Sequence, residues 1–259
     1  MSKEIPLLEQ VLPEGQVVNR GWLYEHGISR PRVDYALRAG KLEPLAHGYY
    51  RLPGPPLKWE HIVYSLNEMG YKVHVGSRSA LELRGHAHYL PVGGATKLDL
   101  CGVARLPAWV LDFSGDYYFV QHSRRLFEDV PVEAIILQPF GAWDWPIPYS
   151  VAELALLELL AGVETTADFS LADKFFESAV NLRPSVLHSL LHNCKQVKAK
   201  RLFLWFSERY NHDWLSVLDI NDIDLGAGKR MIVKGGALDS KYQITVPREM
   251  AGESESTLY

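Results

Sequence analysis

A short segment that begins at Ser29 combines arginine and tyrosine side chains with an apolar stripe. At about 100° per residue of a helix, Val33 and Ala36 share one face, whereas Tyr35 and Arg38 lie on the opposite face. An arginine fork binds O6 and N7 of guanine together, which makes arginine the commonest side chain in specific contacts within the major groove. The pattern therefore favours a helix that buries its aliphatic stripe and contacts nucleic acid with its outer face.

The elements on either side of this helix predict how it is positioned. We expect a first helix over 5–12, a second helix capped by Asn19, and the third helix over 29–40, which ends at a glycine. In segment 42–51, apolar and polar residues alternate on either side of a glycine, which predicts two short strands. Helix, helix, glycine turn, helix and hairpin is the order of elements in a winged helix-turn-helix, whose recognition helix enters the major groove.

Nine side chains of this region are candidates for contact with DNA. Those of the third helix would contact base edges, and the others would contact phosphate groups or form the tip and base of the wing. Asp34 on the outer face weakens the case for DNA slightly, and the alternative is a solvated helix whose arginines have no special role. The nine candidates are Arg20, Ser29, Arg30, Arg32, Tyr35, Arg38, Lys41, His47 and Arg51.

Charge is unevenly distributed along the chain. The whole sequence has 27 basic and 31 acidic residues, a net charge of -4, which excludes a uniformly basic nucleic-acid coat protein. Residues 19–58 nevertheless contain 7 basic and 3 acidic residues, a net charge of +4. A small basic domain at the head of an acidic protein suits local contact with a phosphate backbone.

Segment 51–58 marks the domain boundary that we expect, because its three prolines and one glycine interrupt regular structure. We predict a winged helix-turn-helix domain at residues 1–58 and a larger mixed domain at residues 59–259. Strand patterns precede helical patterns in this second part, which indicates the α+β fold class. The expected strands are 72–75, 97–101, 117–121 and 132–138, and the expected later helices include 184–193 and 197–210.

Two intervening segments have less regular patterns. Trp143 and Trp145 lie among prolines, and we expect them to form an aromatic loop that covers the core. Ser150 and Glu153 have the spacing of a capping box, which predicts that a helix begins there and is stabilised by the serine side chain.

A second basic cluster lies in residues 183–209, where six basic residues face a single acidic one, Glu208. It suggests an electrostatic patch for an acidic partner or nucleic acid. The alternative is an ordinary surface helix that turns Leu202 and Phe206 inward. The residues that would form the patch are Lys195, Lys198, Lys200 and Arg201.

Motifs for metal or nucleotide chemistry are incomplete. Two pairs of histidines have spacings that suit metal ligands: His86 with His88, and His188 with His192 near Cys194. Neither pair is accompanied by a CxxC or HExxH motif, and no phosphate-binding loop is complete. We therefore expect no enzyme activity, no cofactor and no metal. The alternatives are a metal-dependent hydrolase or nuclease that uses these histidines, and a pure protein-interaction module.

Cys101 and Cys194 are too few for a disulfide scaffold and fit a reducing compartment. The first twelve residues lack the pattern of a signal peptide, and no apolar run reaches the roughly 18 residues of a membrane span. We expect a cytoplasmic protein without a membrane-embedded part.

Several segments, spread over nearly the whole chain, together resemble the AbiEi-type antitoxins. None of them is a catalytic signature, and their combination carries the resemblance. They are 73–83 (VHVGSRSALEL), 87–91 (AHYLP), 198–204 (KAKRLFL), 223–230 (IDLGAGKR) and 234–248 (KGGALDSKYQITVPR), with Trp22-Leu23 and 47–51 (HGYYR) in the N-terminal part.

The resemblance implies an antitoxin and transcriptional regulator of a bicistronic, type IV abortive-infection system. Its winged helix would bind inverted repeats in the double-stranded DNA of its own promoter and repress it. Its C-terminal domain would counter a nucleotidyltransferase-like toxin encoded next door, without forming a stable complex. The DNA contacts that the resemblance implies are Arg30, Arg32, Tyr35, Arg38 and Arg51, and it gives the second basic cluster no role.

Overall fold

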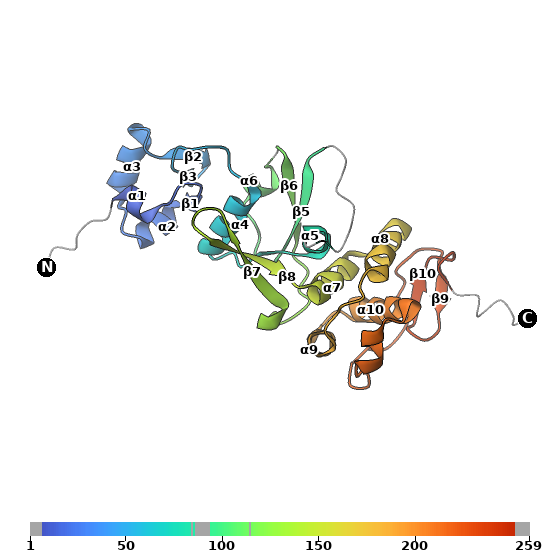
Figure 1. Cartoon of the computed structure of the whole chain (residues 1–259). Coiled ribbons are helices and arrows are strands. Elements are labelled where there is room, and N and C mark those ends of the chain that lie inside the picture. Colours follow the sequence, from blue (N-terminus) through green and yellow to red (C-terminus); the bar gives the residue numbers. More distant parts are fainter. Residues whose placement is uncertain (1–6, 84, 86–93, 114, 252–259) are drawn as a thin grey trace, which may run out of the picture.

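A computed structural model of the chain describes residues 7–83, 85, 94–113 and 115–251. Its elements form three successive groups: small N-terminal helices and strands, a five-stranded sheet with helices, and C-terminal helices with a two-stranded sheet (Figure 1). This combination of helices and separate sheets confirms the α+β class. Within the described ranges, no helix is long and apolar enough to cross a membrane.

The N-terminal group follows the predicted order, with the addition of the two-residue strand β1. The Asn19 side chain caps the second helix by accepting a hydrogen bond of 2.8 Å from the Trp22 amide. The strands pair antiparallel in the order β1-β3-β2, and Gly48 in the hairpin turn has a φ of 79°. The elements are α1 (Leu8–Val11), β1 (Val18–Asn19), α2 (Arg20–Glu25), α3 (Arg30–Arg38), β2 (Glu43–Ala46) and β3 (Tyr49–Arg51).

Direct contacts hold the N-terminal group against the elements that follow residue 58. The Val17 amide donates a hydrogen bond of 2.8 Å to Ser65 Oγ, and the Val17 side chain packs in the apolar cluster of the five-stranded sheet. The Tyr49 and Tyr71 hydroxyls lie 3.0 Å apart. Burial, together with this bond, raises the pKa of Tyr49 to about 12. Residues before the expected boundary at residue 58 therefore contact the elements that follow it, and Val17 is buried in the same apolar cluster as those elements.

The five-stranded sheet has the order β6-β5-β4-β8-β7 and is mixed. The pairs β5–β6 and β4–β8 are parallel, and the pairs β4–β5 and β7–β8 are antiparallel. Its strands are β4 (His74–Val75), β5 (Thr96–Cys101), β6 (Tyr117–His122), β7 (Ile135–Phe140) and β8 (Trp145–Ser150).

The two faces of this sheet differ in chemistry. Leu98 and Leu100 belong to one apolar cluster with α4 (Trp59–Glu68) and α6 (Ala108–Leu111). Because side chains alternate along a strand, Asp99 and Cys101 of β5 point to the opposite face. That face lies beneath α5 (Ser77–Leu83) and α7 (Ala152–Gly162), which pack against each other. One face of the sheet is thus apolar, and the other carries buried polar side chains.

The structure corrects two predictions around residue 150. Trp145 begins strand β8 and is buried against Tyr64, with the ring centroids 4.3 Å apart, so it does not lie in a loop. Trp143 does lie in the turn before β8, where it is 64% exposed. The prolines of β8 are tolerated because the neighbouring β4 is only two residues long and pairs with β8 at Tyr149 alone. Ser150 does not cap α7, since its hydroxyl donates to Glu158 Oε2 at 2.7 Å.

The C-terminal group is built around a helix whose central part is buried on all sides. Every residue of α10 from Ala199 to Ser207 is buried, and Phe203 and Phe206 have no exposed surface. The helices α9 and α10 have the predicted bounds. The elements of this group are α8 (Thr166–Glu177), α9 (Pro184–Asn193), α10 (Val197–Tyr210), the 3-10 helix η2 (Asp213–Val217), β9 (Ala237–Asp239) and β10 (Ile244–Val246), and a further 3-10 helix, η1 (Val132–Ala134), precedes β7.

Candidate nucleic-acid interface

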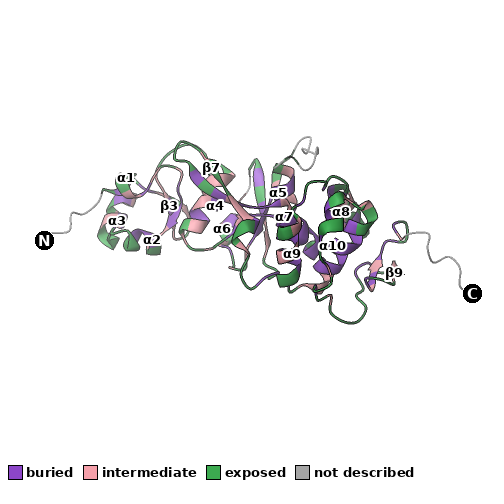
Figure 2. Cartoon of the chain, turned by 60° about the horizontal axis from the view of Figure 1, so that its bottom comes forward, coloured by how far each residue is buried: buried purple, intermediate pink, exposed green. Residues whose placement is uncertain are grey.

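The outer face of α3 is exposed, as its helical pattern predicts. Val33 is fully buried and Ala36 is 6% exposed, whereas the whole Tyr35 residue is 60% exposed and the Arg30 side chain is 76% exposed. Arg38 is exposed one turn later. Figure 2 shows exposed residues along α3 at the N-terminal end of the molecule. The buried face of α3 therefore anchors the helix, and two arginines and a tyrosine are exposed to solvent on its outer face.

Asp34 lies among these basic side chains and partly balances them. Its Oδ1 is 3.4 Å from Arg20 Nη2, and its Oδ2 is 3.9 Å from Arg30 Nε. Arg38 Nε donates to the Asp34 carbonyl at 3.1 Å. These pairs are exposed or half-buried, so each contributes at most about 1 kcal/mol to stability. Their main effect is to hold the arginines over the outer face of α3.

Arg20 connects the helices to the hairpin. Its Nε donates a hydrogen bond of 2.9 Å to Tyr50 Oη, and its guanidinium lies 5.8 Å from the centre of the Tyr50 ring. The bond to Tyr50 is the main cause of a raised Arg20 pKa. Arg20 is therefore charged and oriented by β3 on one side and by Asp34 on the other.

The remaining candidates differ in how freely they are exposed. Lys41 and His47 are exposed, with His47 in the hairpin turn, and Ser29 is the exposed N-cap residue of α3. Arg32 is half-buried. Arg51 is bound internally: its guanidinium donates to the carbonyls of Pro55 at 2.8 Å and Gly54 at 3.3 Å, and it lies 3.3 Å from Glu43. Lys41 and His47 are thus free to contact a ligand, whereas the Arg51 guanidinium is engaged in bonds within the protein.

The structure corrects the expectation of a basic surface patch on the second cluster. Lys200 and Arg201 are 4% and 3% exposed. The Arg201 guanidinium donates to the carbonyls of Leu225, Gly226, Gly228 and Gln243 at 2.7–3.3 Å. The apolar side chains of α10 are surrounded on all sides, so the basic residues between them are enclosed as well.

The two outer members of that cluster are also engaged in the protein. Lys198 Nζ donates to the Val163 carbonyl at 2.9 Å, and Lys195 forms an ion pair with Glu128. Burial lowers the pKa of Lys198. Arg201 and Lys198 therefore hold neighbouring segments of the chain together, Lys195 pairs with Glu128, and the four residues do not form one exposed patch.

The histidine pairs do not come together as a metal site in the described residues. The rings of His188 and His192 are stacked 6.1 Å apart, and His188 Nε2 lies 3.0 Å from Asp222 Oδ1. Within the described ranges, neither belongs to a group of three possible ligands. His86 and His88 lie outside the described residues. Both cysteines are free and buried, as their number predicts.

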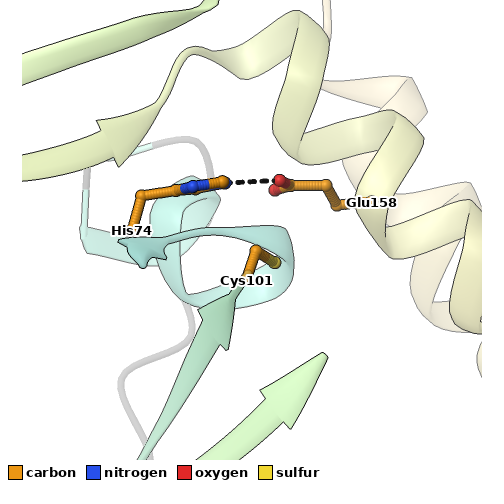
Figure 3. Close-up of side chains that lie close together, drawn as sticks. All are labelled: His74, Cys101 and Glu158. Carbon is orange, nitrogen blue, oxygen red and sulfur yellow. Dashed lines mark hydrogen bonds and ion pairs between the residues drawn. The ribbon is translucent and has the colours of Figure 1, made fainter. Parts of the chain in front are cut away.

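A different group of side chains is brought together, and the sequence analysis missed it. His74, Cys101 and Glu158 have potential ligand atoms that all lie within 4.8 Å of one another (Figure 3). They come from β4, β5 and α7, so no local spacing connects them. The available signal was the alternation of Leu98 to Cys101, which places two polar side chains on a buried face of the sheet.

Two family comparisons describe the chain. Residues 95–247 match a family described as transcriptional regulator, AbiEi antitoxin, type IV TA system, and residues 1–92 match the AbiEi antitoxin N-terminal domain. Among solved structures, the chain is similar to the RV2827C protein from Mycobacterium tuberculosis, with 15% identity and a TM-score of 0.48 over 89% of this chain and 86% of that one. No curated protein matches it. Since the family matches span nearly the whole sequence, the chain belongs to the AbiEi antitoxin family of transcriptional regulators from type IV toxin–antitoxin systems.

Proposed function

We propose that residues 1–58 act as a winged helix-turn-helix that binds the double-stranded DNA of the protein's own promoter and represses its operon. The observation that carries this proposal is the exposed face of α3, where Arg30, Tyr35 and Arg38 project from a helix fixed by its buried stripe. A helix of this kind contacts base edges in the major groove with its N-terminal residues.

The other basic residues support the same mode of binding. Arg20, Lys41 and, at the hairpin turn, His47 would contact phosphate groups, which give affinity without sequence preference. Arg51 would act indirectly, because its bonds to Glu43 and to the following segment fix the base of the hairpin. Ser29 and Arg32 are placed at the start of α3, where a helix approaches the groove.

The test is binding of the full-length protein to a DNA fragment from upstream of its operon. We expect specific binding that weakens steeply with salt, since lysine and arginine displace counterions from the phosphates. The variant Arg30→Ala/Arg38→Ala should lose specific binding and flatten the log–log salt slope by about two units. A control variant, Arg105→Ala/Lys229→Ala, removes the same charge from exposed positions outside this region. Equal losses in the two variants would contradict the proposed interface.

We also propose that residues 59–259 counter a nucleotidyltransferase-like toxin encoded beside this gene, without a stable complex. Membership of an antitoxin family supports this role. Co-expression with the neighbouring toxin should relieve its growth inhibition. The variant Arg30→Ala/Arg38→Ala should still relieve it while losing repression, because the two roles rest on different parts of the chain. Loss of both roles in a folded variant would contradict that division.

A further inference from the structure

Three neighbouring strands place ionisable side chains in one row. His74 of β4 is paired with Cys101 of β5, and Cys101 is paired with His122 of β6. Paired residues on neighbouring strands point to the same face of a sheet. Asp99, two residues before Cys101, shares that face. His122 Nε2 lies 2.7 Å from Asp99 Oδ1, so His122 and Asp99 partner each other.

The helix α7 adds a buried carboxylate to this row. Glu158 Oε1 lies 2.6 Å from His74 Nε2, and Glu158 is 7% exposed. In Figure 3 the His74 ring and the Glu158 carboxylate point toward each other, with the Cys101 side chain beside them. Cys101 is 5% exposed. Imidazole, thiol and carboxylate therefore converge from three different elements.

The surroundings of Glu158 hold it in this position. Its second oxygen, Oε2, accepts hydrogen bonds from the Ser77 amide at 2.9 Å and from Ser150 Oγ at 2.7 Å. Hydrogen bonds of this kind orient the ligands of metal sites and tune their affinity. Gly76 leaves the necessary space, since a Cβ there would lie 2.6 Å from Cys101 Sγ and closer still to Glu158 Oε2.

We propose that His74 Nε2, Cys101 Sγ and Glu158 Oε1 bind one Zn²⁺ ion. Three protein ligands with one position left for water or another ligand is the arrangement of zinc sites that are open to solvent. The proposal is independent of the DNA contacts of α3, which belong to another part of the molecule.

The choice of ion follows from the donor set. A thiolate beside an imidazole selects Zn²⁺ over Mg²⁺ or Ca²⁺, which prefer oxygen ligands. Tetrahedral Zn²⁺ with usual bond lengths keeps its ligand atoms about 3.3–3.8 Å apart. The present separations, all within 4.8 Å, need shifts of roughly an ångström to reach that geometry. His74 and Glu158 would separate to admit the ion between them.

The three residues also line a cleft, so an ion can reach them. The cleft has a volume of about 610 Å³, and His122 and Arg124 lie on its wall as well. The fourth position of the ion would therefore be accessible from the cleft.

The experiment uses the full-length protein, freed of metal with a chelator. One sample is titrated with Zn²⁺ and a separate sample with Co²⁺. We expect one equivalent of Zn²⁺ to bind and to raise the melting temperature. Co²⁺ should produce a thiolate charge-transfer absorption in the near ultraviolet. The variants Cys101→Ser and His74→Ala should weaken Zn²⁺ binding at least about 100-fold, because even second partners of metal ligands account for 10–100-fold.

Cys194→Ser is the matched control, since Cys194 is equally buried and lies outside this group. It should keep the Co²⁺ absorption and the stoichiometry. Ser150→Ala, which leaves all three ligands in place, should weaken Zn²⁺ binding about 10–100-fold and provides a test if a ligand variant fails to fold. Absence of stoichiometric Zn²⁺ binding, or a thiolate absorption that survives Cys101→Ser, would overturn the proposal.

Discussion

The helices α3 and α10 both carry basic residues, yet they use them in opposite ways. On α3, Arg30 and Arg38 are exposed and contact Asp34 at the surface. On α10, Arg201 is buried and donates to four backbone carbonyls of the C-terminal segment. Arginine at the surface can exchange water for a phosphate or a base, whereas buried arginine stabilises the fold.

The difference follows from the apolar pattern around each arginine. The helix α3 has a narrow stripe that includes Val33 and Ala36, which leaves one face free. The helix α10 has large apolar residues on every side, so neighbouring elements enclose it. A local excess of basic residues therefore indicates a binding surface only where the helix keeps a polar face. Four substitutions test this contrast, beginning with the largest expected effect.

Arg201→Met should lower the free energy of unfolding by about 3 kcal/mol, because it removes charged hydrogen bonds and leaves several carbonyls without donors. Urea denaturation followed by circular dichroism measures the loss. The matched substitution Arg38→Met on α3 should change stability by less than about 0.5 kcal/mol. Similar losses in both variants would remove the distinction between the two helices.

Arg183→Met tests a basic residue at the edge of the C-terminal group. Arg183 binds both oxygens of the buried Glu153, at 2.9 and 3.0 Å, and its own side chain is 52% exposed. Removing it leaves a buried carboxylate with backbone donors alone. After allowance for solvent screening of the exposed arginine, we expect a loss of about 2 kcal/mol at pH 7.

The pH dependence of this pair has a definite sign. Burial alone would raise the pKa of Glu153, but hydrogen bonds from Arg183 outweigh burial and lower it from 4.5. Because the pKa of Glu153 is lower in the folded state than in the unfolded state, its ionised form stabilises the fold when the pH is above the pKa of the unfolded state. This stabilisation is lost as the pH falls through the pKa of the folded state. The difference between the native protein and Arg183→Met should therefore shrink below about pH 4.5. A constant difference from pH 7 to pH 3 would contradict this account.

Arg38→Ala should weaken binding to promoter DNA by about 1 kcal/mol, roughly fivefold, and flatten the salt slope by about one unit. Fluorescence anisotropy over a series of salt concentrations measures both. Arg105→Ala removes an equal charge from an exposed position outside α3 and should leave the slope unchanged. The comparison fails if the two variants behave alike.

Asp34→Asn should have the smallest effect, with the opposite sign. It removes the negative charge that lies between Arg20 and Arg30, so DNA affinity should rise about twofold to threefold. Stability should fall by less than about 1 kcal/mol, since these ion pairs are exposed to solvent. Weaker DNA binding by a folded Asp34→Asn would mean that Asp34 positions the arginines more than it neutralises them.

Local patterns predicted local structure well. The cap at Asn19 and the glycine turn at residue 48 were recognisable because each depends on a few adjacent residues. Strand β8 was missed because its prolines argued against a strand, and only the shortness of β4 makes them acceptable.

The buried groups depended on distant parts of the chain. Glu158 contacts His74 across 84 residues, and Arg201 contacts Gln243 across 42. Neither pair has a spacing that helix or strand geometry could reveal. Ser150 shows the same limit in another way, since its spacing suits a helix cap but its hydroxyl binds Glu158 instead.

The contacts between Val17 and Ser65, and between Tyr49 and Tyr71, have a mechanical consequence. They connect the N-terminal group to the elements around the sheet directly, in addition to the covalent link through residues 51–58. If two copies of the chain occupied an inverted repeat, the distance between their half-sites would be set by how the bodies meet. Inserting base pairs between the repeats would then weaken binding, because the insertion changes both the distance and the rotation between the two half-sites.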